Sequence, residues 1–170
     1  VMTSRWAFEA LAVNQFKTNK FEKQFYHYDK KMSISDFKKN YWISKLKGKI
    51  DKSLTNYNDP KSKEEITADL RLVHDEVAKE MKANRKMKFT VLEQLTYENF
   101  NAEVAAKTHT YFDQLQKYYI KMYNASSDAK DVVISNLNKT DIDREKFLQN
   151  KNEYFNEALS DLVKNANNLD

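Results

Sequence analysis

Three histidines, His27, His74 and His109, are the side chains in this sequence best suited to bind a metal or to transfer a proton. A di-iron helical bundle requires Glu-x-x-His pairs, but the residues three positions before these histidines are Gln, Arg and Ala. No His-Glu-x-x-His segment is present for zinc. His74 has two acidic neighbours in sequence, yet consecutive helical residues point in different directions and do not converge on one ion. We therefore expect three solvated surface histidines and no metal or other cofactor.

The sequence also lacks the residues that usually carry out nucleophilic catalysis and phosphate transfer. The chain has no cysteine, and Gly48 is its only glycine, so a thiolate, a glycine-rich phosphate loop and a Gly-x-Ser-x-Gly elbow are all excluded. Glu76 and Glu80 share a helix face, as a catalytic carboxylate pair would, but Lys79 and Lys82 lie beside them. We interpret this group as ion pairs on a helix surface. The sequence predicts a chain that is not an enzyme.

Basic residues are concentrated at the start of the chain. Residues 1–63 carry 14 Lys and Arg against 6 Asp and Glu, and all of the 14 except Arg5 are lysines. Lysine is less suited than arginine to bidentate phosphate contacts, so we favour a solvated basic face, with anionic lipid, an acidic partner and nucleic acid as alternatives. Lysines alternate with aromatics such as Phe21 and Phe25, as in grooves that bind single strands. The helical spacing of the aromatics favours a place in the core, and we do not expect nucleic acid as a partner.

The elements that position these residues are predicted to be helices. One glycine and one proline are too few for the tight turns of a 170-residue β domain. Apolar residues recur instead at helical spacing, most clearly over 43–57 and 66–81. We expect a single all-α domain over 1–170, an irregular bundle of five to seven helices. Further expectations are a cap at Ser33 or Ser35 and a long helix capped by Thr96 and broken at 124–127. One last helix should start at Thr140 and carry Leu148, Phe155, Leu159 and Leu162.

The opening residues carry the most specific pattern in the chain. Residues 4–16, SRWAFEALAVNQF, resemble the Arg-[Trp/Tyr]-[Ala/Gly]-x-Glu-[Ala/Gly]-Leu-x-x-x-[Gln/Glu]-[Phe/Trp] segment of ABC-2 type permeases, above all the ABCG, or White-type, transporters. The positions that match are Arg5, Trp6, Ala7, Glu9, Leu11 and Phe16. The match covers 13 residues, and the remainder resembles the long external insertion of large bacterial members.

This resemblance implies a place and a set of partners. In that family the segment follows the fifth membrane span and forms a short helix near the outer membrane surface. Residues 1–17 would then be a juxtamembrane helix, and 18–170 a periplasmic insertion of a bacterial inner-membrane transporter. The implied partners are the transmembrane and ATP-binding parts of the parent transporter, with a second permease subunit or a periplasmic protein as further candidates. The implied role is gating or protein interaction, with ATP hydrolysis elsewhere in the parent.

Two functions of other classes remain open from the residues alone. One is a basic binding module for anionic lipid or nucleic acid, which salt-dependent binding would favour. The other is a helical sensor of a small ligand, which a ligand-dependent rise in melting temperature would favour. No polar cluster in the sequence nominates a pocket for such a ligand.

Overall fold

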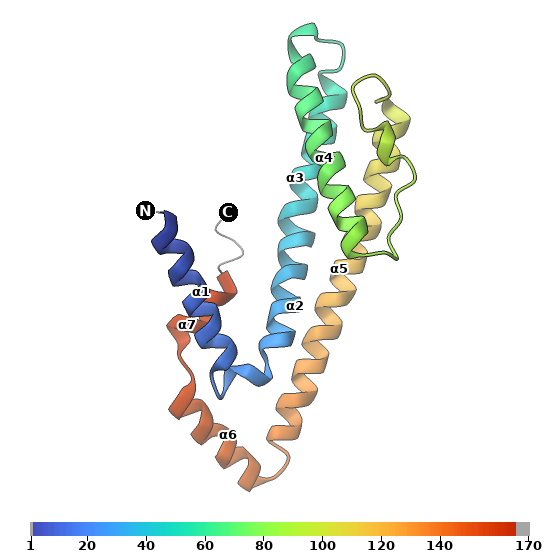
Figure 1. Cartoon of the computed structure of the whole chain (residues 1–170). Coiled ribbons are helices and arrows are strands. Elements are labelled where there is room, and N and C mark those ends of the chain that lie inside the picture. The colour runs from blue at the N-terminus through green and yellow to red at the C-terminus, as the bar shows by residue number, and fades with distance from the viewer. Residues whose placement is uncertain (1, 166–170) are drawn as a thin grey trace. The chain divides into compact units, whose positions relative to one another are not determined.

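A computed structural model of the chain describes residues 2–165, with side chains described for Ala7 and for residues 10–161. Every regular element in that range is helical, which confirms the all-α class (Figure 1). The α-helices are α1 (Met2–Thr18), α2 (Tyr26–Phe37), α3 (Ile43–Thr55), α4 (Lys63–Ala83), α5 (Ala102–Leu137), α6 (Asp141–Tyr154) and α7 (Glu157–Asn165). Shorter elements are the 3-10 turns η1 (Glu22–Gln24), η3 (Pro60–Ser62) and η4 (Leu92–Gln94), and a π-helix, η2 (Lys38–Trp42).

The contacts of the chain divide it into two compact units. Unit 2 is one continuous stretch, Lys38–Tyr119, whereas unit 1 combines Val1–Phe37 with Ile120–Asp170. The chain passes between the units at two places, where α2 meets η2 and within α5. The expectation of one domain over 1–170 stays a prediction, because two compact units joined by continuous helices can unfold either together or in turn.

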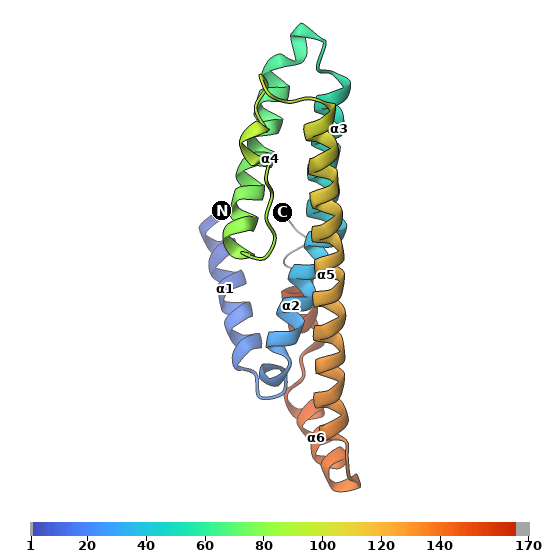
Figure 2. The ribbon, with the colours of Figure 1, turned by 90° about the vertical axis from the view of Figure 1, so that its right-hand side faces the viewer.

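Unit 2 is built on two amphipathic helices that pack side by side, α3 and α4 (Figures 1 and 2). Their apolar stripes are the ones that the sequence predicted. Ile43, Leu46 and Ile50 in α3 are at most 3% exposed, and the α4 stripe is buried at Ile66, Leu70, Val73 and Val77. The first part of α5 completes this core with Phe112 and Leu115, both fully buried.

The connection from α4 to α5 covers the same core. Over residues 84–101 only η4 is helical, yet Phe89, Val91, Leu95 and Phe100 are all buried. Its far end is tied to the turn after α3 by Tyr97, whose ring stacks on Tyr57 at 5.1 Å between centroids. The Tyr57 hydroxyl donates to the Tyr97 carbonyl at 2.7 Å. This segment thus covers the core of unit 2 and contains one 3-10 turn.

Unit 1 is centred on aromatic side chains from both of its sequence segments. Phe21, in the turn after α1, lies 5.5 Å from Phe25, 5.4 Å from Phe147 and 5.8 Å from Phe155, measured between ring centroids. Phe21 and Phe25 are 6% and 3% exposed. The expectation that these two aromatics lie in the core is therefore confirmed.

Two predicted helix boundaries at serine and threonine are wrong. Ser33 and Ser35 do not cap a helix but lie inside α2, where the Ser35 hydroxyl donates to the Lys31 carbonyl at 2.7 Å. Thr96 belongs to a turn, and α5 starts later because Asn101 caps it, accepting from the Glu103 and Val104 amides. In both places a polar side chain found a backbone partner that sequence spacing alone does not reveal.

In the last part of the described chain, a predicted break is absent and a predicted single helix is divided into two. The predicted break at 124–127 is absent, because Asn, Ala and Ser all tolerate a helical backbone, and α5 continues over 36 residues. Thr140 does cap α6, accepting from the Asp143 amide at 3.1 Å. The single last helix is wrong, however. Phe155 is extended, and Asn156 starts α7 by accepting from the Leu159 amide at 3.0 Å.

Candidate functional site

The family-like segment forms most of α1, and its described side chains divide between two faces. Ala12 and Phe16, one helical turn apart, are 5% and 1% exposed. Ala7 and Leu11, also one turn apart, lie on another face, where Leu11 is 56% exposed. The side chains of Arg5, Trp6 and Glu9 lie outside the described side chains, although their backbone is helical. The segment therefore presents one apolar face to unit 1 and leaves a large apolar side chain in solvent.

Helix α1 pairs with α7 at the other end of the described chain. Asn19, just after α1, donates from its side-chain amide to the Tyr154 carbonyl, just before α7, at 2.6 Å. The oxygen of the same amide accepts from the Phe21 and Glu22 amides at 2.8 and 3.0 Å and so fixes the turn. The end of α1 thus lies beside the residues that lead into α7, and the two helices are in contact (Figure 1).

A second polar feature is buried in unit 2 around Glu80. This carboxylate is 4% exposed, accepts from the Tyr119 hydroxyl at 2.5 Å and lies 3.2 Å from the Lys38 ammonium. Lys38 and Tyr119 are the first and last residues of unit 2. The prediction of surface ion pairing is therefore wrong for Glu80, because its partners come from η2 and α5 rather than from Lys82. Sequence spacing along α4 could not reveal partners that lie about 40 residues away on either side.

The neighbouring Glu76 shows the predicted pairing and one more contact. The Lys79 ammonium donates to it at 2.8 Å, and the Trp42 indole N–H donates to its other oxygen, also at 2.8 Å. The hydrogen bond from Lys79, assisted by the one from Trp42, holds the pKa of the Glu76 carboxyl below its usual value against the effect of partial burial. The Lys38 ammonium lies 3.5 Å from the centre of the Trp42 ring. Together these contacts hold both ends of the π-helix η2 against α4.

Two tyrosine hydroxyls complete the Glu80 cluster. Burial raises the pKa of Tyr111 to about 12, with a further contribution from the negative charge of Glu80. Burial and the hydrogen bond to Glu80 raise the pKa of Tyr119 as well. Within the described chain the Tyr111 hydroxyl has no hydrogen-bond partner. The cluster contains no nucleophile paired with a base, and its contacts serve to join three elements of unit 2.

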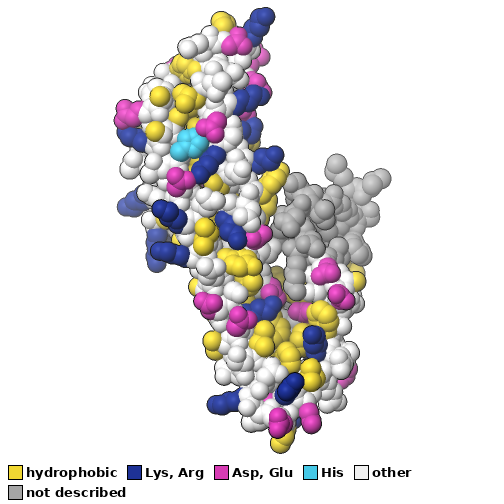
Figure 3. All heavy atoms as spheres, turned by 180° about the vertical axis from the view of Figure 1, so that it is seen from behind, with side chains coloured by type: hydrophobic (Ala, Val, Ile, Leu, Met, Phe, Trp, Pro, Cys, Tyr) yellow, Lys and Arg dark blue, Asp and Glu magenta, His cyan; other side chains and the backbone are white. Residues whose placement is uncertain are grey.

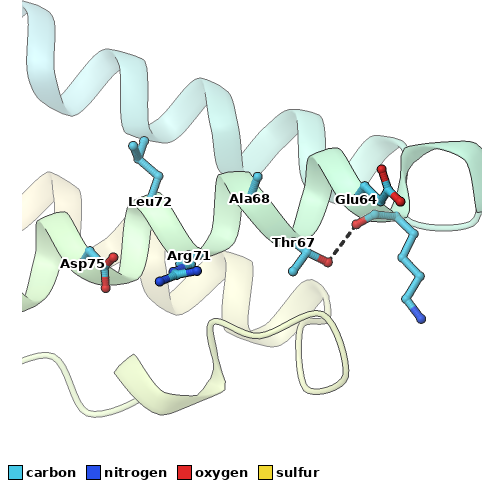
Figure 4. Close-up of a pocket in the computed structure, with 7 residues that line it drawn as sticks. Glu64, Thr67, Ala68, Arg71, Leu72 and Asp75 are labelled. Atoms are coloured by element: carbon cyan, nitrogen blue, oxygen red, sulfur yellow. Dashed lines mark hydrogen bonds between the residues drawn. The ribbon is translucent and has the colours of Figure 1, made fainter.

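The outer face of α4 carries an open hollow (Figure 4). Its lining comes from this one helix, with Ala68 in the middle and Glu64, Thr67, Arg71, Leu72 and Asp75 around it. Leu72 is 44% exposed, and the Thr67 hydroxyl is already bonded to the Lys63 carbonyl at 2.8 Å. The hollow is a shallow surface between long side chains of mixed charge, and its lining shows no set of groups that converge on a ligand.

The histidines are less uniform than predicted. His27 is exposed, as expected. His74 and His109 are partly buried; a ring nitrogen of His74 lies 3.0 Å from Asp75, and one of His109 lies 2.8 Å from Asp51. Over the described residues no group of three or more His, Cys, Asp or Glu side chains is placed to hold a metal ion. No helix in the described part of the chain has the length and apolar character needed to cross a membrane.

Charge on the described surface is mixed. On the face shown in Figure 3, Lys and Arg side chains alternate with Asp and Glu and with apolar side chains. Several lysines of the basic N-terminal part are engaged: Lys47 with Asp113 at 2.5 Å, Lys49 with Asp69 at 2.5 Å and Lys52 with Glu65. Carboxylates from α4 and α5 thus offset the charge excess of residues 1–63 within unit 2.

Comparisons with known proteins identify no relative. No protein-family model matches the chain, and neither the curated proteins nor the solved structures give a significant match.

Proposed function

We propose that this chain is a non-catalytic, extracytoplasmic interaction domain carried in the external loop of an ABC transporter permease. The observation that carries the proposal is that α1 buries one apolar face and leaves an apolar side chain exposed on another. The segment that resembles the permease pattern buries Ala12 and Phe16 in its own unit while Leu11 stays 56% exposed. A single exposed leucine is common on protein surfaces, and Leu11 counts here because it lies in the segment that resembles the permease pattern. In this proposal it contacts the membrane spans or a second permease subunit.

The pairing of α1 with α7 also supports this placement. An insertion between two membrane spans needs an entering and a leaving segment that lie side by side, because both spans start at the same membrane surface. The α1–α7 pair, which is in contact and joined through Asn19 and Tyr154, has this property. In this proposal the remaining helices form the interaction or gating body that the pair carries.

The first test is made in the intact transporter. Replacing residues 20–165 by a short linker should impair export or its coupling to ATP hydrolysis, whereas unchanged transport would overturn the proposed role. A finer test is Leu11→Glu, with Val132→Glu as the matched control because Val132 is 60% exposed on α5. Loss of transport in the first variant and not in the second is the expected result; equal effects would count against a specific contact at α1.

The compartment is tested separately. The chain has no native cysteine, so Val132→Cys in a transporter without other accessible cysteines gives one defined thiol. A membrane-impermeant maleimide should label this thiol in cells whose outer membrane has been permeabilised and whose inner membrane is intact. Labelling only after lysis of the inner membrane would contradict the extracytoplasmic location while leaving the interaction role to be judged by the Leu11 variants.

The alternative function, a basic module for anionic lipid or nucleic acid, has weaker support. Such binding needs a field of one sign, and lysines in unit 2 are paired with carboxylates of α4 and α5 instead.

A further inference from the structure

A cavity in unit 1 brings together three segments that are distant in sequence. It has a volume of about 330 Å³, at the lower end of the range typical of small-molecule sites. Its walls come from the turn after α1, the end of α5 and the first part of α6. The lining residues are Lys20, Gln24, Asn136, Leu137, Asp143, Lys146, Phe147 and Asn150.

Several polar groups of the wall are held in place by contacts outside the cavity. The Lys20 ammonium donates to the Tyr154 hydroxyl at 3.0 Å and lies 4.6 Å from the centre of that ring. The Gln24 amide nitrogen donates to the Phe21 carbonyl at 3.0 Å, which leaves its oxygen as an acceptor. One oxygen of Asp143 accepts from the Thr140 hydroxyl at 2.7 Å. A ligand would therefore meet groups whose positions are already restricted, which lowers the entropic cost of binding.

Other groups of the same wall have no protein partner. Within the described chain, no hydrogen bond or ion pair engages the side chains of Lys146, Asn136 or Asn150. Lys20 and Lys146 both line the cavity, and Asp143 supplies the one carboxylate of its lining, although Glu153 also acts on the charge of Lys20. An anion in the cavity would be attracted by both ammonium groups.

The helix that forms one wall of the cavity is held by few contacts. No residue of α6 is buried. The helix is joined to the first segment of unit 1 by Phe147, whose ring lies 5.4 Å from that of Phe21, and by Tyr154, which accepts from Asn19 and Lys20; Phe155 follows it and also packs on Phe21. A helix held in this way gains stability from any ligand that bridges it to the turn after α1, because binding to the folded form alone must stabilise that form.

We propose that this cavity binds a small hydroxylated carboxylate, of the chemical class of the sugar acids. The two ammonium groups suit a carboxylate, while the amides of Gln24, Asn136 and Asn150 and the free oxygen of Asp143 suit hydroxyl groups. Leu137 and Phe147 supply apolar surface for the carbon face of such a molecule. The volume fits a single ring and not an oligomer. This site goes beyond the proposed interaction role and does not depend on it.

The probe is D-glucuronate, titrated calorimetrically into the 170-residue chain at low salt. Because the cavity is open and small, we expect a dissociation constant of about 0.1–1 mM. D-glucose tests the need for the carboxylate and acetate the need for the hydroxyl groups; both should bind at least about tenfold more weakly. Hydrogen exchange gives a second readout, in which glucuronate should slow exchange of the α6 amides and leave those of α4 unchanged.

The decisive variant is Lys146→Glu, which reverses one charge at the wall. Lys146 is exposed and makes no contact that the fold needs, so folding should persist, as circular dichroism would show. The matched control is Lys139→Glu, an exposed lysine in the α5–α6 connection outside the cavity. We expect Lys146→Glu to weaken glucuronate binding at least about tenfold and Lys139→Glu to change it less than about threefold. Absence of binding to the unaltered chain, equal binding of glucose, or equal effects of the two variants would each overturn the proposal.

Discussion

The buried Glu80 carboxylate gives the most demanding test of how unit 2 is held together. Its two partners, Lys38 and Tyr119, lie 3.2 and 2.5 Å away, and the carboxylate is 4% exposed. In Glu80→Ala the Tyr119 hydroxyl loses a hydrogen bond to a charged group, worth about 1.5–3 kcal/mol. The Lys38 ammonium loses its counter-charge but retains 21% exposure of its side chain, so water offsets part of that loss. We expect a total destabilisation of about 2–4 kcal/mol.

The assay is urea unfolding followed by tryptophan fluorescence in a Trp6→Phe background, where Trp42 is the remaining tryptophan. Trp42 lies beside the cluster, 6.3 Å from Phe112 and 3.5 Å from the Lys38 ammonium. A double-mutant cycle with Tyr119→Phe isolates the Glu80–Tyr119 contact, for which we expect a coupling of about 1–2 kcal/mol. A coupling near zero, or a loss in Glu80→Ala no larger than that of an exposed glutamate such as Glu64, would refute the reasoning.

Three further perturbations test other parts of the chain. Gly48→Ala should raise the unfolding free energy by about 1 kcal/mol in a urea titration, because alanine favours the helix more than glycine and nothing lies within 4 Å of the added Cβ. A lower unfolding free energy in this variant would contradict the prediction. Lys130→Ala should cost about 3 kcal/mol by the same measurement, because Asp29, 2.6 Å from that ammonium and 8% exposed, keeps a buried charge. The double variant Asp29→Leu with Lys130→Met should be close to neutral. The pKa of Tyr111 is about 12 in the folded chain and about 10 in the unfolded chain. The stability that the protonated Tyr111 hydroxyl contributes is therefore fully present below about pH 10 and is lost as the pH rises to about 12. Spectroscopic titration of tyrosinate should therefore show a fraction that ionises late, and its absence would refute the burial argument.

Where the sequence predicted correctly, the signal was periodic and local. The stripes of α3 and α4 needed only apolar residues three and four apart, and Thr140 marks a helix start by its own chemistry. The errors have a different origin. Residues 124–127 suggested a break because they are polar, but tertiary packing buries Ser126 at 6% exposure and the helix continues.

The parts of the candidate sites that could not be predicted all depend on distant partners. Glu80 looked like a surface residue until Lys38 and Tyr119 met it from other elements. The cavity of unit 1 combines Lys20 with residues that follow it by more than 100 positions, and no spacing rule connects them. Leu11 was predicted as a family position, but only the packing of α1 shows that its side chain remains exposed.

The division into a continuous and a discontinuous unit has a consequence for how the chain folds while it is being synthesised. Residues 38–119 can complete their core as soon as the ribosome has released them. Within unit 1, α1 is made before α6 and α7, so Asn19 must wait for Tyr154, 135 positions later. Phe21 likewise meets Phe147 and Phe155 only after the second segment of the unit has been made. The first segment of unit 1 is thus among the last parts of this unit to be buried, and during that interval it is open to chaperones, to proteases and to pairing with another molecule.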